Sequence, residues 1–197
     1  MERVQHLLDS LCAGNDIKYQ ENGDVLLVTP IDVTKPTQYC FELFRALSVE
    51  DIECLTKGYR NSFPKPLKEF YQLSNGAFLF GRFISIYGVP KWDARYKQPV
   101  ALAFADGHRT KGCPNHRLFF ASYNTEPQIQ VFFDTREKDN MHVYAARYGN
   151  NEIIAEWPSF EEWLITESNR YSQKYKNGEY HIENIVEGVL SDIVFEF

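Results

Sequence analysis

The residues with the clearest chemical potential lie in one polar loop. His108, Cys113 and His116 supply two imidazoles and a thiol, which are ligand types that zinc prefers. Their H-x4-C-x2-H spacing matches no usual structural zinc site, and no fourth ligand is specified. Cys113 and His116 also have the residue types of a nucleophile and its base, but the sequence shows no group that would stabilise a thiolate. We therefore expect ordinary loop residues here, with no metal and no cofactor.

Carboxylates are the second group that could do chemistry. Asp134 ends an aromatic segment before Thr135-Arg136, where an aspartate can be a catalytic group or a turn-former, and turn formation is the routine role. Glu161 and Glu162 are adjacent in an expected helix, so their side chains point in different directions. Acidic residues in a first helical turn are favoured by the helix dipole, and we expect capping rather than acid-base catalysis.

The sequence contains no phosphate-binding loop, no dinucleotide-binding glycine motif, no nucleophile elbow and no H-E-x-x-H zinc motif. We therefore expect a protein that is not an enzyme. A small hydrolase that uses Asp134 or the Cys113–His116 loop is the competing interpretation, and it needs a pocket that the spacing does not indicate.

Composition narrows the possible partners. The 197 residues carry a net charge of −6, and 15% of them are aromatic. The central part of the chain is neutral and both ends are acidic, so it lacks the clustered basic residues that bind nucleic acid. No apolar run approaches the length of a membrane span. Cys12, Cys40, Cys54 and Cys113 form no C-x-x-C pair, and we expect reduced thiols in a cytoplasmic protein.

Hydrophobic spacing predicts the elements that must position these groups. Three helices are expected in the first part of the chain: one with Val4, Leu7, Leu8 and Leu11, one with Cys40, Leu43, Phe44 and Leu47, and one that Ser48 caps. Pro66 should lie in the first turn of a further helix, which ends at Asn75-Gly76. Residues 92–104 are ambiguous, and a helix is slightly preferred.

Strand patterns fill the middle of the sequence. The expected strands are Val25 to Val28, Ala77 to Phe80, Phe83 to Tyr87, Leu118 to Tyr123, Ile129 to Asp134, His142 to Arg147 and Glu152 to Trp157. Ser159 and Glu162 form a capping box that opens a helix with Phe160, Trp163 and Leu164 on one side. Strands run together without βαβ alternation, so the predicted class is α+β with helices packed on a mixed, mainly antiparallel sheet.

The last segment carries an apolar stripe. Ile182, Ile185, Val186, Val189, Leu190 and Ile193 recur at helical spacing. A short isolated helix is marginal in water, so this face needs a cover. Docking onto the chain's own core, a second copy or a partner all stay open, and so does a strand over 194–197.

The order of these motifs resembles the SUKH superfamily. The resemblance rests on Phe63-Pro64-Lys65-Pro66 with the helix that ends at Asn75-Gly76, on Gly81-Arg82-Phe83, on the later aromatic strands, and on Trp157-Pro158-Ser159-Phe160-Glu161-Glu162-Trp163-Leu164. Pro66 at the helix start, Gln72-Leu73 at its end and the long segment 88–117 depart from the family pattern. A single domain over 1–197 is expected, with a family-like core at about 48–170, an N-terminal extension over 1–47 and a C-terminal amphipathic extension over 171–197.

The resemblance implies a non-catalytic protein-binding module. Bacterial members resemble immunity proteins that neutralise toxins, often nucleases, and fungal members resemble regulatory hubs of cell-wall synthesis. The expected partner is a protein, a candidate toxin, rather than nucleic acid or a membrane, and the chain is expected to be a monomer or homodimer. Because interface energy concentrates on aromatic anchors and acidic groups steer basic partners, the predicted partner-binding residues are Tyr87, Trp92, Tyr123 and Asp134. Core packing is the alternative for Tyr87 and Trp92.

Overall fold

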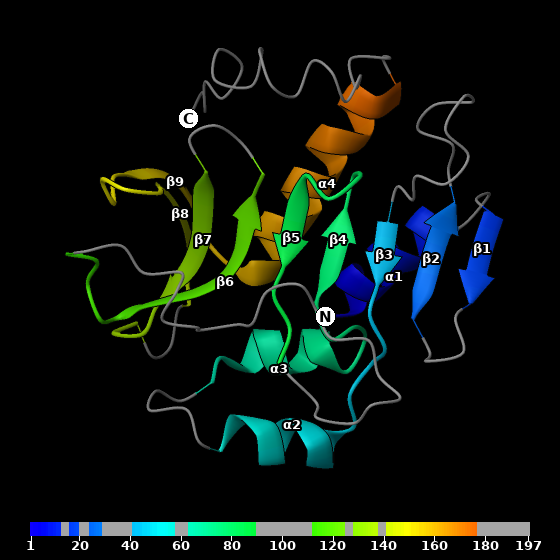
Figure 1. Ribbon diagram of the computed structural model, residues 1–197, viewed down its shortest axis with the longest axis horizontal. Coiled ribbons are helices and arrows are strands. Elements are labelled where there is room, and N and C mark those ends of the chain that lie inside the picture. Colours follow the sequence, from blue (N-terminus) through cyan, green and yellow to red (C-terminus); the bar gives the residue numbers. More distant parts are fainter. Residues whose placement is uncertain are drawn as a thin grey trace. The chain divides into compact units, whose positions relative to one another are not determined.

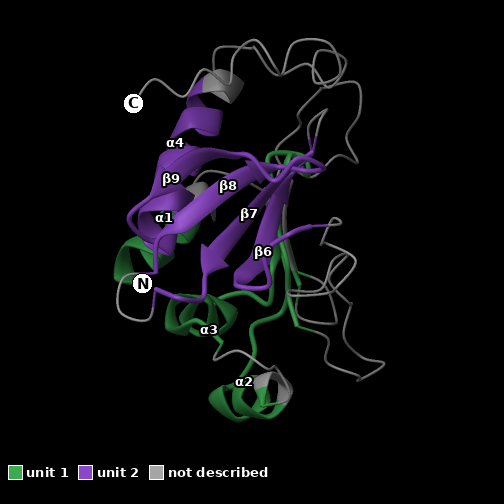
Figure 2. Cartoon of the chain, turned by 90° about the vertical axis from the view of Figure 1, so that its left-hand side faces the viewer, with its two compact units in different colours: residues 1–103 green, residues 104–197 purple. Residues whose placement is uncertain are grey.

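The computed structural model describes residues 1–12, 16–19, 24–28, 41–57, 63–89, 112–124, 128–137 and 141–176. The chain divides into two compact units, Met1–Ala103 and Phe104–Phe197 (Figure 2). Each unit contains an antiparallel run of strands together with α-helix, so the α+β class predicted from the sequence is confirmed. None of the described helices is long and apolar enough to cross a membrane.

Among its described residues, the first unit has five strands in sequence order (Figure 1). They are β1 (Asp16–Tyr19), β2 (Val25–Val28), β3 (Phe41–Leu43), β4 (Ala77–Leu79) and β5 (Ile84–Ile86), and each pairs antiparallel with the next. One row of facing residues runs from Val25 through Leu43 and Ala77 to Ile86. The predictions of β2, β4 and β5 are confirmed, whereas β1 was not anticipated.

The helix expected around Cys40, Leu43, Phe44 and Leu47 is wrong, because residues 41–43 form strand β3. Its residues are buried without alternation, and β3 has paired neighbours on both edges. A single short helix would leave its backbone groups to local partners, whereas two flanking strands satisfy them along the whole segment. Strand pairing therefore prevails over the local helical spacing.

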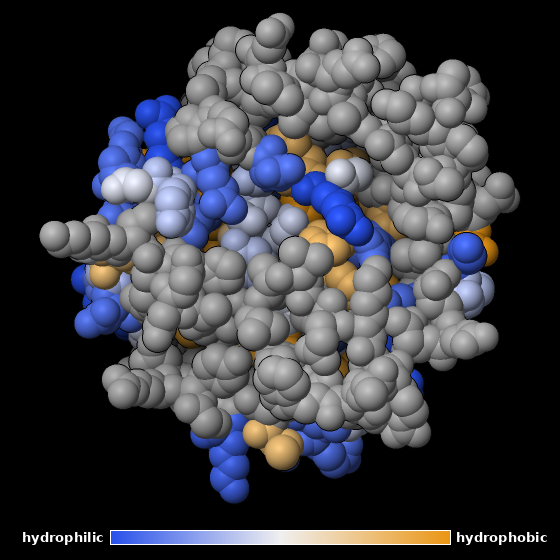
Figure 3. Space-filling view, in the orientation of Figure 1, coloured by the Kyte–Doolittle hydropathy of each residue, from blue (hydrophilic) through white to orange (hydrophobic). Residues whose placement is uncertain are grey.

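The described part of the first unit contains the helices α1 (Glu2–Cys12), α2 (Val49–Thr56) and α3 (Lys65–Tyr71). The predicted cap of α2 is confirmed, since the Ser48 hydroxyl accepts a hydrogen bond of 3.1 Å from the amide of Asp51. Pro66 lies in the first turn of α3, where its missing N–H costs nothing. The buried side of α3 consists of Leu67, Phe70 and Tyr71. Figure 3 shows a small hydrophobic patch over α2 among hydrophilic atoms.

A tight turn joins α3 to β4. Gly76 has φ +89°, a region that residues with a Cβ rarely adopt, and a Cβ there would lie 2.8 Å from the Ile86 carbonyl oxygen. The side chain of Asn75 pairs with both backbone groups of Val89, donating to its oxygen at 2.8 Å and accepting from its nitrogen at 2.9 Å. Asn75-Gly76 thus fixes where the chain leaves α3 and where the segment after β5 lies.

In the part of the second unit that the structure describes, four consecutive antiparallel strands are followed by one helix. They are β6 (Arg117–Tyr123), β7 (Ile129–Asp134), β8 (Val143–Arg147), β9 (Ile153–Trp157) and α4 (Phe160–Lys176), and all five elements were predicted. The N-cap half of the predicted capping box is confirmed, because the Ser159 hydroxyl accepts from the Glu162 amide at 3.1 Å. This bond satisfies a backbone N–H of the first turn of α4, which explains the serine before the helix.

Helix α4 packs on one face of these strands (Figure 2), which divides the aromatic pairs as the sequence indicates. The ring of Phe120 lies 5.2 Å from that of Trp163 and stacks on that of Phe133 at 4.4 Å. Phe119 and Phe132 contact each other at 5.5 Å on the opposite face, because successive strand residues alternate. We call this opposite side of β6–β9 the outer face.

Three predictions lie outside the described residues: the helix over 92–104, the apolar stripe over 182–193 and the strand over 194–197. The single domain over 1–197 stays a prediction. Cys54 and Cys113 are free thiols.

Candidate functional site

The structure does not gather the four predicted partner-binding residues into one surface. Tyr87 follows β5 in the first unit and is 2% exposed, whereas Trp92 lies outside the described residues. Tyr123 ends β6 and is 2% exposed. Asp134 ends β7 and is also buried, at 7%. The exposed aromatic anchors expected at Tyr87 and Tyr123 are therefore absent from the surface of the described residues, and the core alternative holds for Tyr87.

The backbone of Tyr87 is bonded to a buried side chain of α3. Its carbonyl oxygen accepts a hydrogen bond of 2.8 Å from the hydroxyl of Tyr71, a residue of α3 that is itself fully buried. Burying a phenol requires a partner for its O–H, and the chain supplies one from the main chain at the end of β5. Tyr87 thus anchors α3 to the sheet of the first unit.

Tyr123 belongs to a buried network between β6 and α4. Its hydroxyl oxygen accepts from Nε1 of Trp163 at 2.9 Å, and its proton goes to the carboxylate of Glu167. Burial, and next the negative charge of Glu167, hold the pKa of Tyr123 well above its usual value. The network ties the helix to the sheet through hydrogen bonds between buried groups.

Arg170 completes this network from the next turn of α4. Its guanidinium forms an ion pair with the carboxylate of Glu167 and donates to the Tyr171 hydroxyl at 3.0 Å. Burial is the largest single influence and would lower the pKa of Arg170, but the charges of Glu167 and Tyr171 and the hydrogen bond to Glu167 together outweigh it and raise the pKa. Glu167 is only 1% exposed, so this pairing is what allows a carboxylate inside the unit.

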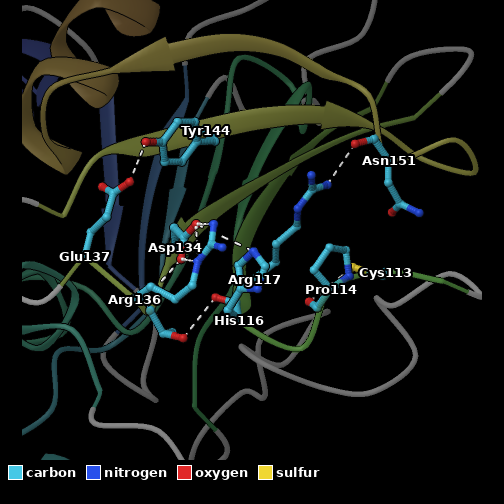
Figure 4. A network of polar contacts seen from close by, with 10 residues as sticks. Cys113, Pro114, His116, Arg117, Asp134, Arg136, Glu137, Tyr144 and Asn151 are labelled. Atoms are coloured by element: carbon cyan, nitrogen blue, oxygen red, sulfur yellow. Dashed lines mark hydrogen bonds and ion pairs between the residues drawn. The ribbon is translucent and has the colours of Figure 1, made fainter.

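A second polar network surrounds Asp134 at the end of β7, and we call it the Asp134 cluster (Figure 4). Asp134 accepts from the backbone amide of Arg136 at 3.0 Å, which closes the turn. The guanidinium of Arg136 also binds both carboxylate oxygens, with Nε at 3.0 Å from Oδ1 and Nη2 at 2.5 Å from Oδ2. The aspartate is therefore a turn-former, as the sequence favoured, and also an arginine-binding group.

The electrostatics of the pair follow from this geometry. The hydrogen bond from Arg136 lowers the pKa of Asp134, and the same bond raises the pKa of Arg136. His116 contributes a nitrogen 3.6 Å from Oδ2 of Asp134. Arg136 is 69% exposed, whereas the side chain of Asp134 is 10% exposed. The result is a guanidinium that faces solvent but is held in one orientation by a buried partner.

The flanks of the cluster are also fixed. Arg117 donates to the backbone oxygen of Asn151 at 2.9 Å and lies over the ring of Phe132, with its guanidinium carbon 4.6 Å from the ring centre. Burial lowers the pKa of Arg117. On the other side the Tyr144 hydroxyl donates to Glu137 at 2.7 Å, and burial, followed by this bond, raises the pKa of Tyr144. Figure 4 shows these contacts on the two sides of Asp134.

Nothing in this arrangement activates a nucleophile. The Cys113 thiol contacts the carbonyl of Pro114 at 3.8 Å, and His116 is turned toward Asp134. His108 lies outside the described residues, among which no group of three His, Cys, Asp or Glu side chains could hold a metal ion. A carboxylate already bound by an arginine is a poor base, since its proton affinity is lowered. The cluster is better suited to binding than to acid-base catalysis.

Reasoning from the sequence identified Asp134 but missed Arg136, Arg117 and Tyr144. An Asp-x-Arg sequence at a strand end was the available signal for Arg136, because the turn that aspartate closes returns the arginine to its carboxylate. Arg117 and Tyr144 carried no such local signal, because strand pairing opposes Arg117 to Asp134 and Tyr144 to Phe132.

Comparisons with known proteins assign the chain to a family. No curated protein and no solved structure matched the chain. The model of the SMI1 / KNR4 family (SUKH-1) matches residues 46–166, which begin in the first unit and end in α4 of the second. The match takes in the Asn75-Gly76 turn, the Asp134 cluster and the buried network up to Trp163. The chain therefore belongs to the SMI1 / KNR4 family (SUKH-1).

Proposed function

We propose that this chain is a non-catalytic protein-binding module of the cytoplasm, an immunity protein that binds and neutralises a toxin encoded beside it. Membership of the SMI1 / KNR4 family (SUKH-1) supports a role in protein binding, as immunity protein or regulator. Of the four residues predicted for partner binding, we place Asp134 at the centre of a contact surface on the second unit. Arg136 is the exposed residue of this surface.

The observation that carries this proposal is the fixed, exposed guanidinium of Arg136. Arginine is enriched at the residues that dominate interface energetics. An arginine side chain normally loses rotamer freedom when it binds, and this loss weakens affinity. Asp134 holds Arg136 in place before any partner arrives, so less freedom remains to be lost. Its planar donors can then serve carbonyl or carboxylate groups of the partner.

The side chains beside Asp134 and Arg136 are also held by internal hydrogen bonds. Glu137 and Tyr144 lie beside the pair, and the hydrogen bond between them restrains both side chains. Arg117 is tied to Asn151 on the other side. A partner would therefore meet a polar surface whose side chains are already oriented by internal bonds. Such preorganisation favours a slow dissociation rate and high selectivity rather than broad binding.

Two assays test the proposal: capture of the candidate toxin by the purified chain, and protection of cells from that toxin. The product of the neighbouring gene should bind the purified chain, and co-expression of the chain should restore growth to cells that express that product. Arg136→Ala should weaken capture and protection while the protein stays folded, because its side chain is largely exposed. Lys65→Ala is the matched control, since Lys65 is an exposed cation on α3 whose ion pair with Glu69 is only a surface contact. No capture by the unmodified chain would refute the immunity role.

A regulatory hub of the cell-wall-synthesis type is the second candidate, because the same family membership supports it. It predicts several cellular partners captured through the Arg136 surface and no neighbouring toxin. The two roles differ in the number and identity of the captured proteins, so capture with mass spectrometry separates them.

A further inference from the structure

The β8–β9 hairpin of the second unit combines a terminal strand with exposed hydrophobic side chains. Strand β9 is the last of the four strands, and among the described residues of the unit only β8 pairs with it. Two of the large hydrophobic side chains exposed in the described structure belong to this hairpin, Tyr148 at 43% and Ile153 at 50%. A strand edge without a partner among the described residues, next to exposed apolar groups, is a template for another strand, and proteins usually blunt such edges with charged side chains, proline or β-bulges.

The segment that contains β9 is acidic. Residues 148–162 contain Glu152, Glu156, Glu161 and Glu162 and no lysine, arginine or histidine. Register pairs Glu156 with Tyr144 and Ile153 with Ala146, with a shift in the pairing between Ala145 and Ala146. The edge therefore presents an apolar side chain between carboxylates instead of the lysines that would discourage pairing.

Two basic groups of the chain itself pair with Glu152 and Glu156. Nδ1 of His142 lies 2.7 Å from Glu156, and Arg147 lies 3.4 Å from Glu152. Both contacts are at the surface, where such pairs contribute little and exchange readily. An incoming cationic side chain can replace either contact at small cost.

We infer that the outer edge of β9 binds an extended, basic segment of a partner protein by strand addition, with lysine or arginine beside Glu152 and Glu156 and an apolar residue beside Ile153. This inference rests on the proposed protein-binding function and adds a second contact surface to the Asp134 cluster. Main-chain hydrogen bonds to the open edge supply affinity, and the alternating side chains supply selectivity.

Charge also decides against a second copy of this chain as the occupant. Antiparallel pairing of two β9 strands would bring the glutamates of both copies to one shared edge, and facing like charges destabilise strand pairs. A basic segment has the opposite effect, since attraction speeds its approach and compensates the carboxylates after docking. The acidic edge thus selects for a cationic strand and against self-association.

The experiment uses the full chain, labelled with ¹⁵N, and a synthetic peptide of alternating lysine and valine. Binding should shift the amide resonances of β8 and β9. Ile153→Lys should weaken binding by about tenfold or more, because it replaces the apolar contact with a cation that repels the lysines of the peptide. Val49→Lys is the matched control, since Val49 is 49% exposed on α2 and its replacement should leave the affinity unchanged.

Two further peptides separate strand addition from charge attraction. A glutamate–valine peptide of the same length should not bind. A lysine–valine peptide that is N-methylated at alternate positions keeps its charge but loses backbone donors, so it should bind far more weakly. Equal binding of the methylated peptide, shifts outside β8 and β9, or no effect of Ile153→Lys would each overturn the inference.

The failure of this inference can be told apart from failure of the proposed function. If the product of the neighbouring gene is captured equally by Ile153→Lys and Val49→Lys, the β9 edge is not used and the immunity role stands. If neither the variants nor the unmodified chain captures that product, the immunity role fails, and the peptide measurements alone decide whether β9 accepts a basic strand.

Discussion

The hydroxyl of Tyr123 should be among the most important single polar groups in the second unit. It accepts from Trp163, whose side chain is fully buried, and donates to Glu167, which is 1% exposed. Tyr123→Phe keeps the ring and its contact with Tyr171, whose ring centre lies 6.3 Å away, and removes only the oxygen. The change therefore isolates the hydrogen bonds from the packing.

The expected cost follows from two losses. The indole N–H of Trp163 is left buried without its acceptor, which costs about 1–3 kcal/mol. The carboxylate of Glu167 loses the hydrogen bond that it accepts from Tyr123, and a hydrogen bond to a charged group contributes about 1.5–3 kcal/mol. Arg170 keeps Glu167 paired, so the second loss is only partly felt. We expect a decrease of about 2–5 kcal/mol in the free energy of unfolding. A loss of that size is a large fraction of the stability of an ordinary domain.

Equilibrium unfolding in urea, followed by tryptophan fluorescence and circular dichroism, measures this change. Tyr148→Phe is the matched control, because it removes the same atom from a tyrosine that is 43% exposed. Its effect should stay within about 0.5 kcal/mol. If the two variants lose the same stability within that margin, the buried network does not stabilise the packing of α4 on β6, and the reasoning is refuted.

Three further expectations concern the turns and the titrating groups. Gly76→Ala should cost more stability than Gly149→Ala in the same urea assay, because both glycines have positive φ but only Gly76 has backbone within 3 Å of an added Cβ; equal losses would contradict the steric argument. Asp134 has a lowered pKa in the folded state, so its contribution is present above about pH 4 and is lost as the pH falls through the folded pKa. Asp134→Asn should therefore destabilise the protein at pH 7 and narrow its difference from the unmodified chain at pH 3, and a pH-independent difference would count against the Arg136 pairing. Tyr123 has a raised pKa when folded, so stability should decline above about pH 10, where only the unfolded state loses this proton, and Tyr123→Phe should flatten that decline in denaturation midpoints measured from pH 9 to 11.

The candidate site was less accessible to sequence reasoning than the fold. Asp134 was found because its role is local: it closes a turn with a residue two positions later. Tyr123 was expected on the surface because it ends a strand, yet Trp163 and Glu167 of α4 enclose it from forty or more positions away along the chain. Strand ends are exposed only where no helix covers them, and that condition depends on the packing of distant segments.

The sequence by itself determined the elements whose signals are local. Ser48 and Ser159 mark helix starts because a cap is a bond between residues three apart, and Asn75-Gly76 marks a helix end because few residues accept positive φ. Tertiary structure alone decided that residues 41–43 form β3 rather than a helix, since the partners that satisfy its backbone lie in β2 and β4. It also decided that Arg117 and Tyr144 join Asp134, because strand register brings residues together that no spacing along the chain relates.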